Sequence, residues 1–158
     1  MINNQAVLAT LRMVNEENLD VRACTMGINL CRCANPDPKK MVTAVYDRIM
    51  TVAKDLVKTC EEATTLFGVN VVNKRVSISP ASMLLEGHDE DTAVELCKAL
   101  DRAAGELGVD LLGGFSALVH KGITPGERTL IESLPRALAE TTHVCSSINV
   151  GTTRAGIN

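Results

Sequence analysis

The feature that most constrains the fold is a helical pattern that ends at a glycine and is followed by a strand pattern. The chain contains this unit twice, as "LFGVNVVNKRVSIS" around Gly68 and "ELGVDLLGGFSALV" around Gly108. Glycine closes a helix because it adopts the left-handed backbone conformation without steric cost, and Val-rich sequence favours strands. Helices that alternate with strands provide the crossover connections of a parallel sheet. The repeat therefore predicts an α/β fold.

Capping residues and apolar spacing predict where the helices lie. Asp37 and Pro38 begin a pattern of apolar residues at steps of three and four that reaches Ala63, which predicts one helix of about 40 Å. Thr124 and Glu127 form a capping-box pattern at the start of a later helix, and Pro135 is expected to kink or end that helix. Two other helices are expected. One follows Asn3 and Asn4 and has Val7, Leu8, Leu11 and Val14 on one face, and the other closes at Gly108 with Ala93, Leu96, Cys97, Leu100, Ala104 and Leu107 buried. The expected strands are one that ends near Leu30 and three that begin at Val69, Val109 and Val144.

The size and composition of the chain fit one globular domain. The chain has 158 residues, of which 46% are hydrophobic and 22% are charged. We therefore expect residues 1–158 to form either a single α/β domain or the N-terminal fragment of a larger barrel. Four strands and four helices suit either a small open sheet or part of a barrel, and periodicity does not choose between them. "GTTRAGIN" at the end of the chain is expected to be a strand-end loop that leads into a further helix.

Composition also excludes several partners. Aromatic residues are only 2% of the chain, Trp is absent and the net charge is -3, so a nucleic-acid surface built on base stacking is not expected. No apolar run reaches the length of a membrane span. The six cysteines lie in apolar and helical stretches without a secretory signal, which favours reduced thiols and a cytoplasmic protein.

Cationic residues follow or interrupt the expected strands. Ligands of parallel α/β folds bind at the carboxyl ends of the strands, and Arg and Lys pair with anions through charge-assisted hydrogen bonds. A small anionic metabolite is therefore the expected partner; the alternative is a set of solvated loop charges. The residues at these positions are Cys31, Arg32 and Cys33, then Asn73, Lys74 and Arg75, then His120 and Lys121, and finally Thr152, Thr153 and Arg154.

Two stretches within this set are more specific than the rest. "NKR" interrupts a Val-rich segment that resumes at Val76, so at least one cation is expected to point into an apolar neighbourhood, unless the strand ends at Val72. Gly113 and Gly114 inside a strand pattern indicate either close approach of a ligand to the backbone, with Ser116 beside them, or a bend at a barrel corner without a ligand.

The thiols divide into core and candidate chemical groups. Cys60 and Cys97 lie on helical core stripes. Cys31 and Cys33 are too close together for a standard zinc half-site, so no metal site is expected, and no cofactor is indicated. Cys145 and His120 are the candidates for chemistry, the alternatives being a packed thiol and a solvent-exposed loop histidine.

Several strings also resemble a known family. "LDVRACTMGINL", "VNVVNKRVSISP", "LGVDLLGGFSALVHKG" and "SLPRALAETTHVCSSINVGTTRAGIN" are similar to the N-terminal third of a prokaryotic domain of unknown function that is often labelled "PFL family protein". The resemblance implies a barrel of parallel βα units related in fold to the pyruvate formate-lyase and glycyl-radical group, of which this chain would be an incomplete part. It implies no activity, because fold kinship does not carry mechanism.

Three functional hypotheses follow. The first is the N-terminal part of a cytosolic α/β barrel protein that binds or converts a small anionic metabolite. The second is a regulatory module that senses the metabolite without catalysis, and the third is a truncated product without independent function. An open half-barrel leaves strand edges and apolar faces uncovered, so we also expect a homo-oligomer.

Overall fold

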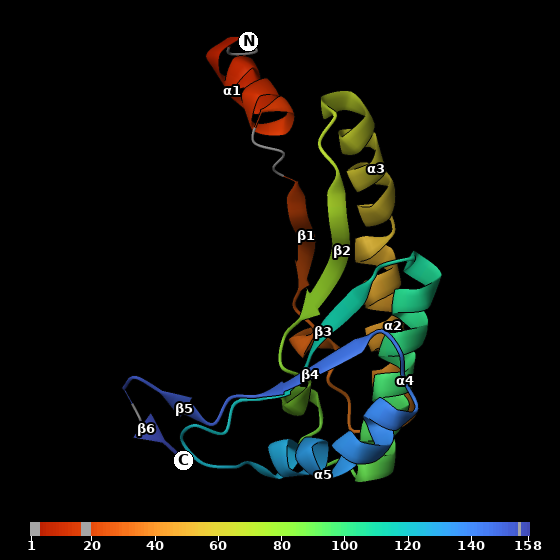
Figure 1. The fold of residues 1–158 in the computed structure, drawn as a ribbon. Coiled ribbons are helices and arrows are strands. Elements are labelled where there is room, and N and C mark those ends of the chain that lie inside the picture. Colours follow the sequence, from red (N-terminus) through yellow and green to blue (C-terminus); the bar gives the residue numbers. More distant parts are fainter. Residues whose placement is uncertain (1–3, 17–19, 155) are drawn as a thin grey trace.

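The structure is a computed structural model that describes residues 4–16, 20–154 and 156–158. Its centre is a four-stranded sheet with helices against one face (Figure 1). The elements in chain order are α1 (Asn4–Asn15), β1 (Val21–Ile28), the 3-10 helix η1 (Cys31–Cys33), α2 (Pro38–Ala53), α3 (Leu56–Phe67), β2 (Val71–Ile78), the 3-10 helix η2 (Ala81–Leu84), α4 (Glu90–Leu107), β3 (Leu111–Ala117), α5 (Pro125–Ala139), β4 (Val144–Ile148), β5 (Gly151–Thr152) and β6 (Gly156–Ile157).

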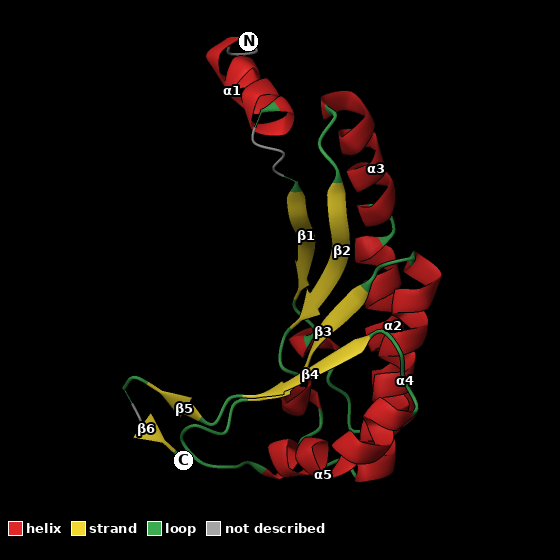
Figure 2. Ribbon diagram, viewed as in Figure 1, coloured by secondary structure: helices red, strands yellow, loops and turns green. Residues whose placement is uncertain are grey.

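The four long strands are parallel and lie in the order in which they occur in the sequence, β1-β2-β3-β4. Each crossover therefore moves one strand further in the same direction, and α2, α3, α4 and α5 lie on the same side of the sheet (Figure 2). The described helices leave the other side of the sheet uncovered. The predicted α/β class with a parallel sheet is confirmed.

The core lies between the sheet and these helices. Phe115 of β3 is fully buried and is the largest side chain in it. The stripe predicted for α4 is buried as expected at Ala93, Leu96, Cys97, Leu100 and Ala104, while Leu107 is partly buried. Since aromatic residues are scarce, aliphatic side chains fill most of this layer, including Leu30, Met41, Val45, Ile49, Val76, Leu85, Leu112 and Leu130.

The predicted helix ends are confirmed by their geometry. Gly68 and Gly108 end α3 and α4 with φ of 69° and 68°, the left-handed conformation that glycine adopts readily. Asp37 caps α2 by accepting hydrogen bonds from the backbone N–H groups of Lys39 and Lys40. Thr124 and Glu127 form the expected capping box at the start of α5.

The prediction of a single long helix after Asp37 is wrong. The helix is interrupted at Lys54 and Asp55, which divides it into α2 and α3. Asp55 has φ of -102° and ψ of 2°, outside the helical region, and its carbonyl oxygen accepts the first hydrogen bond of α3. Ile49, Ala53, Leu56 and Cys60 remain buried across the break. The apolar spacing stays in phase because both helices face the same sheet, and periodicity therefore does not reveal the interruption.

Two further expectations concern the C-terminal side of the described chain. Of the two outcomes expected for Pro135, the end is not observed, because α5 continues through Pro135 to Ala139. One proline removes a single backbone donor, and α5 is held by its packing against α4 along its length. The expected strand-end loop at "GTTRAGIN" contains a short antiparallel pair, β5 with β6.

The N-terminal helix α1 stands apart from the other helices (Figure 1). Its predicted apolar face is exposed at Val7, Leu8 and Leu11, by 42%, 65% and 50%. Asn3, the other proposed cap, and the side chain of Val14 lie outside the described part of the molecule. Among the described helices, none combines the length and apolar character needed to cross a membrane.

Cys97 gives a pH-dependent test of this core. It is fully buried between α4 and α5, and burial raises the pKa of its thiol from 9.0 to about 11. The folded state therefore holds the thiol proton more tightly than the unfolded state. The resulting stability is complete below pH 9 and is lost as pH rises towards 11, by up to about 3 kcal/mol. We expect Cys97→Ala to fall less steeply in stability than the unaltered protein across this pH range, as measured by urea denaturation.

The matched control is Cys31→Ala, which removes an exposed thiol from η1. It should keep the steep alkaline loss of the unaltered protein. Identical pH profiles for Cys97→Ala and the unaltered protein would show that Cys97 does not titrate in this way.

Candidate functional site: the open sheet face

Successive side chains of a strand point to opposite faces of a sheet, so each strand divides between the helix-covered face and the open face. Cys24 of β1 points towards α3, because burial and then a hydrogen bond with the Cys24 thiol raise the pKa of Cys60 in that helix. Cys24 is in register with Lys74, and its neighbour Thr25 is in register with Arg75. Lys74 therefore shares the helix-covered face, and Arg75 lies on the open face.

Following this alternation through the sheet defines one surface, which we call the open sheet face. Except for Leu111, and for Val21 and Val71 where β1 and β2 begin, its side chains are small or polar, whereas those on the helix-covered side are mostly apolar. Among the described residues of this face, Arg75 is the one cation. By this alternation the open sheet face consists of Val21, Ala23, Thr25, Gly27, Val71, Asn73, Arg75, Ser77, Leu111, Gly113, Ser116, Cys145 and Ser147.

One transverse row of this face carries very little side-chain volume. Gly27, Ser77, Gly113 and Cys145 are in register across the four strands, and we call them the glycine row. A Cβ atom added to either glycine would meet no atom within 4 Å. The row therefore leaves free space above the sheet between the Ser77 hydroxyl and the exposed Cys145 thiol.

Arg75 lies in the adjacent row, between Thr25 and Leu111. Its side chain is half-buried, and its Nε atom is buried without a hydrogen-bond partner. It forms no ion pair with any residue that the structure describes. Buried polar groups normally have partners, so an unpaired guanidinium beside the free space of the glycine row has the chemistry to bind an anion.

The two glycines of β3 have different roles. Gly114 sits at the irregularity in the β3–β4 pairing with φ of 113°, and a Cβ there would collide with the carbonyl oxygen of Ile78. Strand packing is sufficient to explain Gly114, as in the bend interpretation. Gly113 instead opens onto free space in the glycine row. Ser116 follows them, buried, with its hydroxyl donating to the Gly114 carbonyl at 3.3 Å.

The other predicted site residues lie beyond the strand ends. Lys121, Thr153 and Arg154 are exposed, and Thr152 is half-buried in β5. His120 follows β3, and its Nδ1 atom is buried without a hydrogen-bond partner. The amide of Asn158 donates to the Val119 carbonyl at 2.6 Å, which ties the β5–β6 hairpin to the loop that carries His120. The structure therefore brings His120 close to the hairpin but keeps both apart from Arg75, which is inside β2.

The Cys31 and Cys33 pair is split by burial. Cys31 is exposed, while the Cys33 thiol is buried and donates to the Ala44 carbonyl of α2 at 3.6 Å. Within residues 4–16, 20–154 and 156–158, no three His, Cys, Asp or Glu side chains are grouped closely enough to hold a metal ion.

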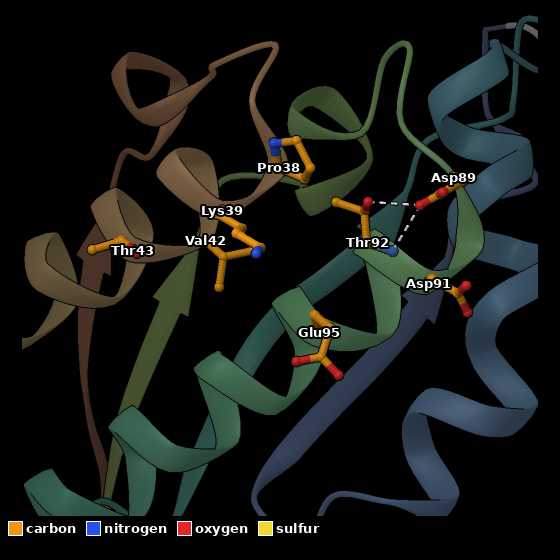
Figure 3. Close-up of a pocket in the computed structure, with 8 residues that line it drawn as sticks. All are labelled: Pro38, Lys39, Val42, Thr43, Asp89, Asp91, Thr92 and Glu95. Carbon is orange, nitrogen blue, oxygen red and sulfur yellow. Dashed lines mark hydrogen bonds between the residues drawn. The ribbon is translucent and has the colours of Figure 1, made fainter.

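A groove that the sequence did not indicate lies on the helix side of the molecule. It has a volume of about 610 Å³ and lies between the first turns of α2 and α4, with the strands behind them (Figure 3). Its carboxylates already have structural partners. Asp89 accepts hydrogen bonds from the backbone and hydroxyl of Thr92, and these hydrogen bonds lower the pKa of Asp89. Asp91 pairs with Arg136. The residues that line the groove are Pro38, Lys39, Val42, Thr43, Asp89, Asp91, Thr92 and Glu95.

Sequence comparison relates the chain to known proteins. Residues 12–158 match the family described as "Uncharacterised ACR (DUF711)". The chain belongs to the DUF711 family. A UPF0210 protein of Syntrophotalea carbinolica is 50% identical over 158 residues, covering 100% of this chain and 35% of that protein. A UPF0210 protein of Ligilactobacillus salivarius is 52% identical over 152 residues, covering 96% and 34%. A UPF0210 protein of Methanococcoides burtonii is 48% identical over 158 residues, covering 100% and 35%.

The DUF711 chain thus spans about a third of the length of the relatives that it matches. Sequence reasoning had singled out Arg75, Gly113, Ser116 and Cys145 of its open sheet face. It missed the polar residues Thr25, Ser77 and Ser147. The alternation of Arg75 and Ser77 with Val76 and Ile78 would have indicated Ser77 once β2 was extended beyond Val72.

Proposed function

We propose that the open sheet face is the binding face for a small anionic metabolite, with Arg75 as the residue that holds the anion. The observation that carries the proposal is the half-buried guanidinium without an ion-pair partner among the described residues. Charge-assisted hydrogen bonds from arginine to an anion are about twice as strong as neutral ones. The glycine row beside Arg75 leaves space for the rest of the ligand.

We also propose that the four βα units are part of a larger α/β barrel of the pyruvate formate-lyase-like kind. Two observations support this. Strand order β1-β2-β3-β4 with helices on one side is the arrangement of a barrel wall, whereas an open doubly wound sheet has helices on both sides. The relatives are also long enough for further units, since the chain covers 35% of several of them. The open sheet face would then line the barrel interior.

Within this proposal the other predicted residues have distinct roles. The hydroxyls of Ser77 and Ser147 are candidate donors to the ligand, the Ser116 hydroxyl holds the backbone at Gly114, and Gly113 permits close approach of the ligand. The Cys145 thiol, at one end of the glycine row, is the candidate nucleophile. Lys121, Thr152, Thr153 and Arg154 would act at the rim, with His120 as a candidate acid or base. Cytoplasmic location and a homo-oligomer stay predictions.

Neighbouring residues on β2 provide the test. We expect Arg75→Ala to weaken binding of small anions by about tenfold or more, as expected for loss of a charge-assisted hydrogen bond. Lys74→Ala, which removes a cation from the opposite face of the same strand, should leave binding within about twofold. Binding is measured by NMR titration at constant ionic strength, because screening changes all charge interactions.

Equal losses in the two variants would contradict the proposal, because they would indicate a general effect of net charge. Metabolites that bind can then be incubated with the protein and followed for turnover. Conversion that is abolished by Cys145→Ala would indicate an enzyme. Saturable binding without conversion would favour the sensing alternative.

A further inference from the structure

Resting on the proposed function, we infer that the ligand of the open sheet face is a small monocarboxylate bound edge-on by the Arg75 guanidinium, rather than a phosphate compound. Three features of the described residues carry this inference: the charge of the face, the edge that Arg75 presents and the shape of the glycine row.

The charge of the face matches a monoanion. Arg75 is the single cation among the residues that make up the open sheet face, since Lys74 points to the helix-covered side. Lys121 and Arg154 lie in loops beyond the strand ends. A phosphate monoester carries about -1.5 to -2 charges at neutral pH, and proteins usually bind it with several cations or a helix N-terminus. The helices α2, α3, α4 and α5 all lie on the opposite side of the sheet, so none of these described helices directs its N-terminus at the open sheet face (Figure 2).

The free edge of Arg75 matches a carboxylate. The Nε atom has no hydrogen-bond partner but is buried, so the Arg75 side chain must turn over the glycine row for this edge to meet a ligand. An Nε–H group together with a terminal N–H forms a planar fork that donates two parallel hydrogen bonds to the two oxygens of a carboxylate. Lysine retains the charge but lacks this fork, so the fork predicts a specific requirement for arginine.

The glycine row fixes where the rest of the ligand lies. Adjacent rows on the same face of a strand are separated by about 7 Å, since a parallel strand rises about 3.3 Å per residue. A carboxylate on Arg75 therefore directs the ligand body over Ser77 and Gly113, where a Cβ atom would meet no atom within 4 Å. Leu111, in register with Arg75, provides an apolar contact. The site is suited to a short carboxylic acid with one hydrogen-bonding group near Ser77.

The experiment uses the 158-residue chain and a set of simple probes. Acetate, propionate and butyrate are compared with inorganic phosphate and glycerol phosphate at constant ionic strength, and the Arg75 Nε–H resonance is followed by NMR. We expect the carboxylates to shift this resonance saturably and the phosphates to leave it unchanged. Arg75→Lys should weaken carboxylate binding by about tenfold or more, whereas Lys74→Ala should not. Gly113→Val should weaken butyrate binding more than acetate binding.

The outcomes separate this inference from the function on which it rests. Phosphates that bind more tightly than carboxylates, in a manner abolished by Arg75→Ala, would overturn the monocarboxylate while supporting the anion-binding face. Carboxylate binding that survives Arg75→Lys would overturn the edge-on fork. If no probe shifts the Arg75 resonance of the folded chain, both proposals fail. Circular dichroism establishes that each variant is folded, and Gly113→Ala replaces Gly113→Val if the larger side chain unfolds the protein.

Discussion

Replacing Gly114 with alanine is expected to lower the free energy of unfolding by about 3 kcal/mol or more. Gly114 has φ of 113°, a conformation that costs a residue with a side chain about 1–3 kcal/mol. Its new Cβ atom would also collide with the carbonyl oxygen of Ile78 and lie 2.6 Å from Cγ1 of the same residue. Backbone at the β2–β3 contact cannot move aside without disturbing the sheet. Urea denaturation followed by circular dichroism measures the loss.

Gly113→Ala is the matched control, because it introduces the same methyl group one residue earlier. Its Cβ atom would meet no atom within 4 Å. We expect a change of less than about 1 kcal/mol, since the substitution faces open space and also restricts the unfolded chain. Similar large losses in both variants would contradict the structural distinction between a glycine that permits strand packing and a glycine that opens the binding face.

Much of the fold could be predicted because local chemistry determines it. Gly68, Gly108 and the capping box of Thr124 and Glu127 act within one or two helical turns, and all were identified from sequence. The break at Lys54 and Asp55 could not be predicted, because the buried spacing from Ile49 to Cys60 continues through it. The order of the strands and the absence of a described helix on one face of the sheet depend on tertiary contacts that periodicity does not encode.

The candidate site was predicted only in part, for a related reason. Reading the residues after each strand identified Arg75 as cationic but grouped it with Lys74. Which of the two faces the helices depends on the pairing of β2 with β1, where Cys24 is in register with Lys74 and contacts α3. The interpretation of Gly113 and Gly114 likewise left a ligand and a bend open, and the position of Ile78 separates the two residues. Assigning a face requires the register of neighbouring strands, which a single sequence does not contain.

Gly126→Ala is the second substitution with a large expected effect, and intrinsic helix propensity predicts the opposite sign. Alanine in a helix is favoured over glycine by about 1 kcal/mol. However, a Cβ atom at Gly126, in the first turn of α5, would lie 2.5 Å from the Ser82 carbonyl oxygen and 2.8 Å from the Glu86 backbone nitrogen. We expect a net destabilisation of about 2–3 kcal/mol, because the clash with backbone atoms of η2 and the loop after it outweighs the propensity.

Gly105→Ala in α4 tests the same substitution where space is available. The nearest atom to its new Cβ would be Nε2 of His143, at 3.8 Å, which is an ordinary contact. We therefore expect stabilisation by about 0.5–1 kcal/mol, measured in the same denaturation experiment. Opposite signs at two helical glycines can arise only from their surroundings. They would establish that the start of α5 packs against η2 and the loop after it, the segment that follows β2. Stabilisation in both variants would contradict that contact.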